Sequence, residues 1–475
     1  MAEPPPIAAA SPSVADIPAA DWRELDRRHH LHPFSDPQRL ARDGARVITR
    51  AAGVHLWDSD GQRLIDGMSG LWNVILGYGR RELVEAAARQ LEILPYYNSF
   101  FATATPSMAA LAAKLAALAP PGLEHVFFAN SGSEANETAI RLARRYWALA
   151  GRPQKMAFIG LERGFHGSTL ASASLGGIAH IHAQAGLPLP GFAHIPSPDL
   201  FRDGSGMAPE EFGILAARRL EERIAELGAE NVAAFIGEPV QGAGGGVIPP
   251  ANFWREVARI CREHEVLLVL DELVTGFGRL GSWFGATHFG LRPDMIVLGK
   301  GITSGYQPLA ATLVGDRIAA ALIAQGGELH HGFTTSGHPV ACAVALAAIA
   351  VLEREGLVAR VATDIGPYFQ DALSVLAEHP LVGEVRGIGL FAAIELVGDK
   401  ERRRRFAPEG LAGSICRDVA MSQGLVMRAA GDTLLLAPPL VIRRDEVDAL
   451  ATHVRLALDT TAEALRRGNV PVAER

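Results

Sequence analysis

The segment Asp294-Met295-Ile296-Val297-Leu298-Gly299-Lys300-Gly301 contains a short apolar run that leads to a lysine between two glycines. Consecutive apolar residues of this length predict a strand that is buried on both faces. Lysine is rarely buried without a partner, and burial lowers its pKa and frees the amine as a nucleophile. Lys300 is therefore a candidate catalytic residue, although a lone lysine at a strand end is usually a solvated terminus.

Further apolar runs of the same kind alternate with helical patterns through the middle of the chain. The runs cover 126–128, 232–236 and 267–270, and the helical patterns cover 134–150 and 253–263. Buried strands separated by helices are typical of a mostly parallel sheet. The sequence therefore predicts an α/β fold with a large, mostly parallel domain.

The two ends of the chain predict a smaller α+β domain. Residues 53–66 resemble a hairpin, 382–396 and 425–436 resemble strands, and one face of a final helix carries Val447, Leu450, Ala451, Val454 and Leu458. A chain of 475 residues is long enough for two domains. We expect a flexible tail over 1–20, an N-terminal arm with part of the small domain over 21–90, the large domain over 91–345, and the C-terminal small domain over 346–475.

The composition is that of a soluble globular protein, with 48% apolar residues, 20% charged residues and a net charge of −7. This balance gives no indication of a nucleic-acid partner. We find no apolar run long enough for a membrane span, which takes about eighteen residues or more. The Ala/Pro-rich start has neither the basic nor the apolar region of a secretory signal. Three separated cysteines without a Cys-x-x-Cys pair favour a reducing cytoplasm.

His29, His30 and His32 form a small histidine cluster near the start of the chain. We identify no carboxylate or cysteine at metal-ligand spacing from them. No metal site is predicted.

A possible anion site follows the apolar run at 126–128. The segment Asn130-Ser131-Gly132-Ser133-Glu134-Ala135-Asn136 opens a helix with small residues. The free backbone N–H groups and the dipole at a helix N-terminus favour a phosphate. Glu134 near the first turn fits a plain capping box equally well, so both interpretations stay open.

A second strand, 267–270, delivers Asp271 to its carboxyl end, which is where α/β sheets bind ligands. Taken alone, such an acid usually caps the next helix or binds a metal. An acid, a lysine and a phosphate cradle at three strand ends are together what pyridoxal 5'-phosphate (PLP) requires: a partner for the pyridinium, a Schiff-base lysine and a phosphate anchor. The large domain is thus expected to bind PLP.

This combination resembles the class III aminotransferases of PLP fold type I, and within them the omega-amino acid:pyruvate and amine:pyruvate transaminases. The resemblance extends from Gly67-Met68-Ser69-Gly70-Leu71-Trp72 to Leu425-Val426-Met427-Arg428-Ala429-Ala430-Gly431-Asp432. It implies a transferase with a large PLP domain and a smaller α+β domain. It also implies a homodimer with shared active sites, or a homotetramer.

The resemblance implies a cofactor site that consists of Ser131, Gly132, Ser133, Phe165, His166, Asp271, Leu273, Lys300 and Thr334. The first three would bind the phosphate, and Phe165 would stack on one ring face where many members have Tyr. Leu273 would press on the opposite face. Thr334 resembles the threonine that reaches the phosphate of the neighbouring subunit, and a loop hydroxyl that caps the following helix is the alternative. Glu238 would orient Asp271 as a third catalytic residue, or serve as a structural hydrogen-bond partner.

The substrate site implied by the resemblance has aromatic walls from Trp72, Phe100 and Phe165. Ala243 would keep one side small. Arg428 matches the family's mobile arginine, which would pair with a substrate carboxylate and swing away for an apolar amine. The alternative for Arg428 is an ordinary surface salt bridge.

The expected reaction moves an amino group from an omega-amino acid or primary amine to pyruvate in two ping-pong half-reactions, giving alanine and an aldehyde or ketone. Lys300 would move a proton as the catalytic base, and Asp271 would keep the ring nitrogen protonated. Alternatives are 2-oxoglutarate as acceptor, a diamine or taurine as donor, and an aminomutase or decarboxylase on the same fold. A silent PLP-binding regulator is a more distant alternative.

Overall fold

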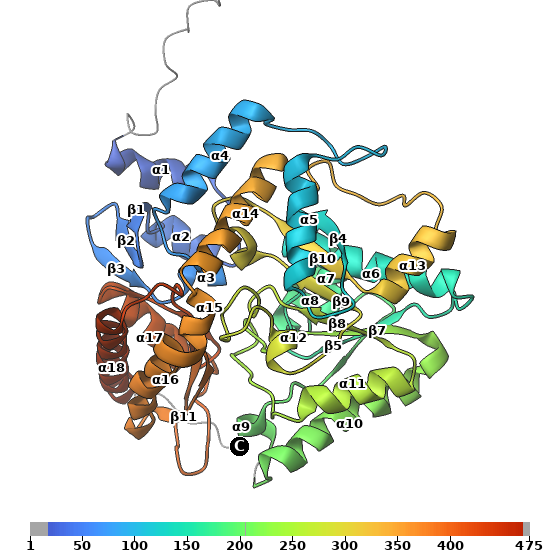
Figure 1. The fold of residues 1–475 in the computed structure, drawn as a ribbon. Helices are drawn as coiled ribbons and strands as arrows, with labels where there is room; N and C mark the ends of the chain where they lie inside the picture. Colours follow the sequence, from blue (N-terminus) through green and yellow to red (C-terminus); the bar gives the residue numbers. More distant parts are fainter. Residues whose placement is uncertain (1–17, 205, 469–475) are drawn as a thin grey trace, which may run out of the picture.

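The protein is described here by a computed structural model that places residues 18–204 and 206–468. The first 17 residues of the predicted tail over 1–20 lie outside these ranges. Figure 1 shows the N-terminal strands beside the C-terminal helices, with the central part of the chain on the other side of the molecule. Across the placed residues, no helix is long and apolar enough to span a membrane.

A seven-stranded sheet forms the centre of the larger part, in the order β4-β10-β9-β8-β7-β5-β6. Its strands are β4 (His125–Ala129), β5 (Ala157–Leu161), β6 (Phe192–Ile195), β7 (Val232–Gly237), β8 (Leu267–Asp271), β9 (Met295–Leu298) and β10 (Ala310–Val314). β7, β8 and β9 are buried along their whole length, as their unbroken apolar sequences predict. The mostly parallel α/β fold is therefore confirmed.

β10 is the exception to the parallel arrangement, because it pairs antiparallel with both β9 and β4. The remaining pairs of this sheet are parallel. In the β8–β9 pair, Asp271 lies opposite Val297. Asp271 and Lys300 therefore emerge from the carboxyl ends of neighbouring parallel strands.

Helices cover the central sheet and fill the connections between its strands. They are α5 (Pro106–Leu118), α6 (Gly132–Leu149), α7 (Leu170–Leu175), α8 (Ala179–Ala185), α9 (Leu200–Asp203), α10 (Pro209–Leu227), α11 (Phe253–Glu263), α12 (Gly285–His288) and α13 (Asp316–Gln325). α6 packs against β9 and β10 through a buried face that includes Ala135, Ala139 and Ala143. The helix that follows the phosphate-type segment is thus anchored directly on the strand that leads to Lys300.

Two four-stranded sheets lie on the other side of the molecule. The first has the order β1-β2-β3-β13, with β1 (Ile48–Ala52), β2 (His55–Asp58), β3 (Arg63–Asp66) and β13 (Leu425–Val426). The second has the order β11-β12-β15-β14, with β11 (Val382–Ile388), β12 (Phe391–Leu396), β14 (Arg428–Ala430) and β15 (Thr433–Leu436). β2 and β3 form the predicted hairpin, and β13 joins it in parallel from the far end of the chain.

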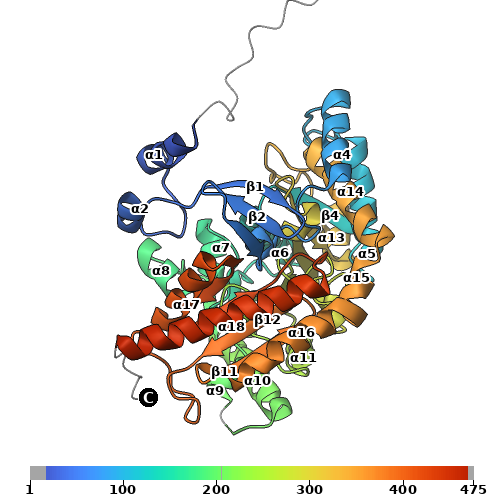
Figure 2. The ribbon, with the colours of Figure 1, turned by 90° about the vertical axis from the view of Figure 1, so that its left-hand side faces the viewer.

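The remaining helices belong to the ends of the chain and to the connection between the two sides. They are α1 (Ala19–His29), α2 (Pro37–Asp43), α3 (Ser69–Trp72), α4 (Arg81–Ile93), α14 (Pro339–Arg354), α15 (Leu357–Arg360), α16 (Gly366–Ser374), α17 (Leu411–Ser422) and α18 (Arg444–Arg467). α1 and α2 lie at the edge of the molecule (Figure 2). The division of the chain into domains at residues 90 and 345 stays a prediction.

Candidate active site

The N-terminus of α6 forms both a helix cap and a cradle of free amides. Ser131 is the N-cap, and its Oγ accepts a hydrogen bond from the Glu134 amide at 3.3 Å. The Glu134 carboxylate accepts from the Asn130 amide at 2.7 Å. The amides of Gly132 and Ser133 precede the first intrahelical hydrogen bond, so they are available to an anion. The cap and the phosphate site are therefore compatible rather than alternatives.

Gly132 is required here by close packing. A Cβ atom at this position would lie 2.1 Å from Cδ2 of Leu273, far inside contact distance. Leu273 in turn follows Asp271, whose Oδ1 accepts from the Leu273 amide at 3.1 Å. The loop after β8 thus lies directly against the cradle. This closeness is what a site for one small cofactor requires.

Asp271 is buried and held by two polar neighbours. Its Oδ2 lies 2.8 Å from His166 Nδ1 and accepts from Asn136 Nδ2 at 2.9 Å. Burial opposes ionisation, yet the hydrogen bond and charge of His166 lower the pKa of Asp271. Burial likewise opposes the charged imidazole, but Asp271 raises the pKa of His166. The pair therefore favours an anionic Asp271, which is the state that keeps a pyridinium nitrogen protonated.

Glu238 is also buried, and it links two loops of the site. Oε1 accepts from the Phe165 amide at 3.0 Å, and Oε2 accepts from the Gly242 amide at 2.9 Å. Burial raises its pKa, and the nearby Asp271 adds to this effect. These contacts fit the structural alternative for Glu238, because its two oxygens fix backbone rather than Asp271 itself.

Lys300 begins a short turn directly after β9, with a left-handed φ of 44°. Burial lowers the pKa of its amine, while the negative charges of Asp271 and Glu238 oppose this shift. Nζ lies 6.0 Å from the ring centroid of Trp72. A lysine with a lowered pKa beside an anionic aspartate has the properties of a Schiff-base lysine.

Trp72 and Arg428 lie together on the small-domain side of Lys300. The Arg428 guanidinium carbon is 5.2 Å from the Trp72 ring centroid. Burial lowers the pKa of Arg428, opposed by Glu238, and no carboxylate in the described part of the chain pairs with it. The salt-bridge alternative for Arg428 is thus not what the structure shows. Ala243 packs against the same apolar cluster as Trp72.

A strained turn holds Trp72 in this position. Ser69, Gly70 and Trp72 have φ values of 50°, 66° and 58°. Ser69 Oγ donates to the Ala437 carbonyl at 2.7 Å and accepts from the fully buried Arg279 at 3.1 Å. The turn is therefore tied both to the small domain and to the loop that follows Asp271.

Two further predicted site residues, Phe100 and Thr334, lie at the segment around Gly332. A Cβ atom on Gly332 would be 2.6 Å from the Phe100 ring, and the Thr334 carbonyl accepts from Tyr96 Oη at 2.6 Å. Thr334 is exposed. The segment around it approaches the start of α6 through Thr335, which donates to Asn130 Oδ1 at 2.7 Å. Their roles in the site remain predictions.

Two residues that the sequence did not single out belong to this site. Asn136 is buried, and its amide donates to Asp271, to the His166 carbonyl and to the Gly132 carbonyl. Its position one helical turn after Gly132 is the feature of the sequence that could have indicated this role. Phe34, from the turn after α1, lies edge-on to Phe165 with ring centroids 6.1 Å apart. Nothing local in the sequence indicates that the arm reaches so far.

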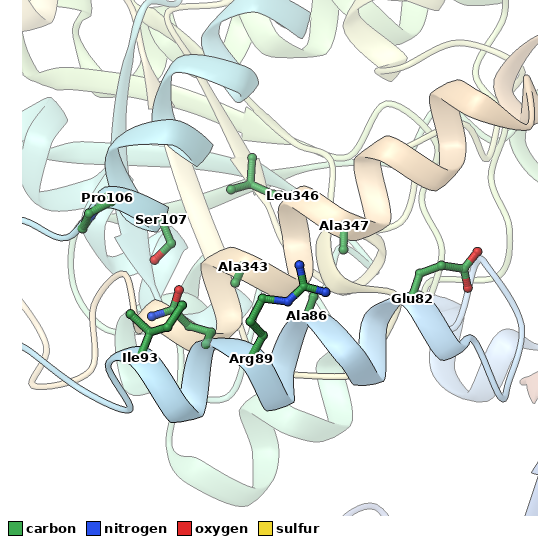
Figure 3. Close-up of a pocket in the computed structure, with 10 residues that line it drawn as sticks. Glu82, Ala86, Arg89, Ile93, Pro106, Ser107, Ala343, Leu346 and Ala347 are labelled. Carbon is green, nitrogen blue, oxygen red and sulfur yellow. The ribbon is translucent and has the colours of Figure 1, made fainter.

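A hollow of about 470 Å³ lies elsewhere, between α4, α5 and α14 (Figure 3). Most of its lining is helical, and Arg89 and Glu82 are its charged residues. None of the predicted site residues contributes to it. We therefore assign the chemistry to the strand ends around Lys300 and not to this hollow.

Replacing Asn136 by alanine tests its role. The variant removes a hydrogen bond to a charged group, worth about 1.5–3 kcal/mol. We expect the single-turnover rate with an amine donor to fall roughly ten- to a hundredfold, with less effect on thermal stability than on rate. Stopped-flow measurement on PLP-saturated protein gives the rate. An unchanged rate would show that His166 alone positions Asp271.

The arrangement of the residues at the strand ends defines a class of protein. A mostly parallel sheet presents a half-buried lysine, an anionic aspartate and a helix N-terminus at one edge, and these residues fit PLP. When bound, PLP supplies an electron sink for the carbanion formed at the substrate carbon.

The comparisons with known proteins agree with this class. Residues 39–458 match the family model described as Aminotransferase class-III. The chain belongs to this family and is a PLP-dependent aminotransferase.

Known relatives and solved structures cover nearly the whole chain. It is 49% identical over 452 residues to the putrescine–pyruvate aminotransferase of Pseudomonas aeruginosa, covering 95% of this chain and 99% of the relative. A thermostable (S)-enantioselective omega-transaminase from Thermomicrobium roseum superposes with a TM-score of 0.91 at 43% identity, over 93% of this chain and 99% of that one. An omega-transaminase from Pseudomonas jessenii in complex with PMP gives 0.92 at 39% identity, over 94% and 99%.

Proposed function

We propose that the enzyme transfers the amino group of a terminal primary amine, and of a short diamine such as putrescine in particular, to pyruvate. The products are alanine and an amino aldehyde. The similarity to putrescine–pyruvate aminotransferase supports the donor and the acceptor. Within the site, the observation that carries the proposal is the pairing of Arg428 with Trp72 beside Lys300.

Each of these residues has a separate task in the proposed reaction. Lys300 would take the proton from the donor carbon and later give up a proton again as the general acid, because burial lowers the pKa of its amine. Asp271, kept anionic by His166, would hold a proton on the ring nitrogen of PLP. Phe165 and Trp72 provide apolar surface for the methylene chain of a donor.

Arg428 accounts for the acceptor. A guanidinium binds a carboxylate through two parallel hydrogen bonds, and Arg428 has no competing salt bridge within the described chain. Pyruvate has such a carboxylate and putrescine has none. Arg428 must therefore bind the acceptor carboxylate in the half-reaction with pyruvate. It must not interfere with the half-reaction of the amine donor.

A panel of donors and acceptors tests the proposal. Putrescine, β-alanine, taurine and an arylalkylamine would each be offered with pyruvate and with 2-oxoglutarate in competition. We expect putrescine with pyruvate to give the highest kcat/KM, with one alanine per amine consumed. Preference for 2-oxoglutarate would instead align the enzyme with its relative, the diaminobutyrate–2-oxoglutarate transaminase of Halomonas elongata, which is 41% identical. Turnover without an acceptor would indicate a mutase or decarboxylase.

We also propose a homodimer, or a homotetramer built from it, in which Thr334 completes the partner's site. Exposed apolar side chains support an interface: Val84, Leu91 and Ile93 on α4, followed by Tyr96, Tyr97 and Phe101. This row leads into the segment that contacts Thr334. A cytoplasmic location is proposed as well, because Cys261, Cys342 and Cys416 are free and buried.

Thr334→Ala tests the shared site, and Thr335→Ala is its matched control. Loss of a hydroxyl that bonds a phosphate should cost about 1.5–3 kcal/mol, or roughly ten- to a hundredfold in PLP affinity. Thr335 donates to Asn130 of its own chain, so its variant should lose less. PLP release on dilution, followed by absorbance, separates the two. A fully active monomer would contradict the proposal.

A further inference from the structure

Three potential metal ligands meet at the end of α1. His30 Nδ1 lies 2.9 Å from Asp26 Oδ1, and His32 Nε2 lies 2.7 Å from Asp26 Oδ2. The two imidazole rings are 4.1 Å apart between centroids. Asp26, which the sequence analysis did not pair with the histidines, lies in the last turn of α1, and its carbonyl accepts from the amide of the C-cap His30. The prediction that no carboxylate lies at metal-ligand spacing from the histidines is therefore wrong.

The geometry points to a zinc site formed by Asp26, His30 and His32. One ligand atom from each residue lies within 4.8 Å of the other two. Two neutral imidazoles and a carboxylate are a donor set that suits zinc, with water in the fourth position of a tetrahedron. Zinc would replace the two hydrogen bonds of the carboxylate with direct metal bonds.

The surroundings of the three residues favour a cation. The side chains of Asp26 and His32 are 22% and 21% exposed and that of His30 is 56% exposed, so the site is open to an ion from solvent. Two of the three neighbouring arginines are already paired, Arg27 with Glu24 and Arg23 with Asp60, whereas Arg28 has no ion pair within the described residues. The local positive charge that would repel zinc is thereby reduced.

The zinc site would connect the N-terminal arm to the active site. His32 is two residues before Phe34, and Phe34 lies edge-on to Phe165. A metal bound to His30 and His32 restricts the turn that carries Phe34, because both ligands are held to Asp26 in α1. Zinc would thus order the arm in the position that the structure shows.

Zinc titration of tag-free, PLP-saturated protein by calorimetry tests the site. We expect one zinc ion per chain at these residues. Even the loss of a residue that only supports a ligand costs about ten- to a hundredfold in metal affinity, so His32→Ala and Asp26→Asn should each weaken binding by at least about tenfold. His29→Ala is the matched control, since His29 is exposed and outside the cluster. It should bind zinc like the parent.

Limited proteolysis gives a second measurement. Trypsin cleavage after Arg27 and Arg28 should slow when zinc is added to the parent and to His29→Ala, but not to His32→Ala. Circular dichroism and unfolding temperature establish that the variants are folded. Equal zinc affinity in His29→Ala and His32→Ala, or the absence of a zinc-dependent change in cleavage, would overturn the assignment.

Discussion

Replacing Lys300 by alanine is expected to lower kcat by about 10⁴-fold, the upper end of what a general acid–base group contributes. The expectation rests on the position of Lys300 after β9, beside Asp271, and on burial that lowers the pKa of its amine. The variant would lose both the proposed covalent attachment of PLP and the proposed base. Steady-state assays of alanine formation from putrescine and pyruvate measure the effect.

Reductive labelling gives an independent readout for the same residue. Borohydride treatment of the PLP-loaded protein should leave the pyridoxyl group on Lys300, as found by peptide mapping. Lys155 is the internal comparison, because burial lowers the pKa of its amine to about 8. Its Nζ, however, donates to the carbonyls of Ala229, Val232 and Glu265. A label on Lys155 would contradict the assignment.

Arg428→Ala should separate the two half-reactions. Removing a guanidinium that binds a substrate carboxylate costs about 2–5 kcal/mol, or roughly thirty- to several-thousandfold. We expect this loss in the KM of pyruvate and of β-alanine. The half-reaction with putrescine or an arylalkylamine should stay close to that of the parent, since these donors have no carboxylate. Stopped-flow measurement of each half-reaction alone gives the comparison.

Arg428→Lys provides the control for charge. It keeps a cation but loses the planar fork, so it should restore only part of the affinity for pyruvate. Equal losses in both half-reactions, or in neither, would show that Arg428 is not the carboxylate partner.

Much of the fold and the centre of the site could be predicted because strand ends leave a local signal. β8 and β9 are unbroken apolar runs, so Asp271 and Lys300 stand out at their carboxyl ends. The direction of β10 could not be predicted, because a run buried on both faces has the same pattern in either orientation.

Other contacts depend on residues far apart in the chain. Asn136 resembles any polar residue in a helix until the fold brings it to Asp271, and Phe34 meets Phe165 across more than a hundred residues. Within one chain, Phe100 lies against Gly332 and the exposed Thr334 bonds to Tyr96, so their predicted roles in a shared site depend on a second copy. Asp26 was missed because its carboxylate faces His30 and His32 only once α1 is formed.

The pairing of β13 with β3 determines the order in which the parts of the protein can assemble. Leu425 is the partner of Ile65, so one sheet contains both an early and a late segment of the chain. During synthesis, β4 to β10 can emerge and form the central sheet before β13 has been made. Until then, the edge of β3 that β13 covers in the folded protein has no partner strand. An unpaired strand edge invites association with other chains. Truncation before residue 425 should therefore leave an aggregation-prone protein whose central sheet can nevertheless form.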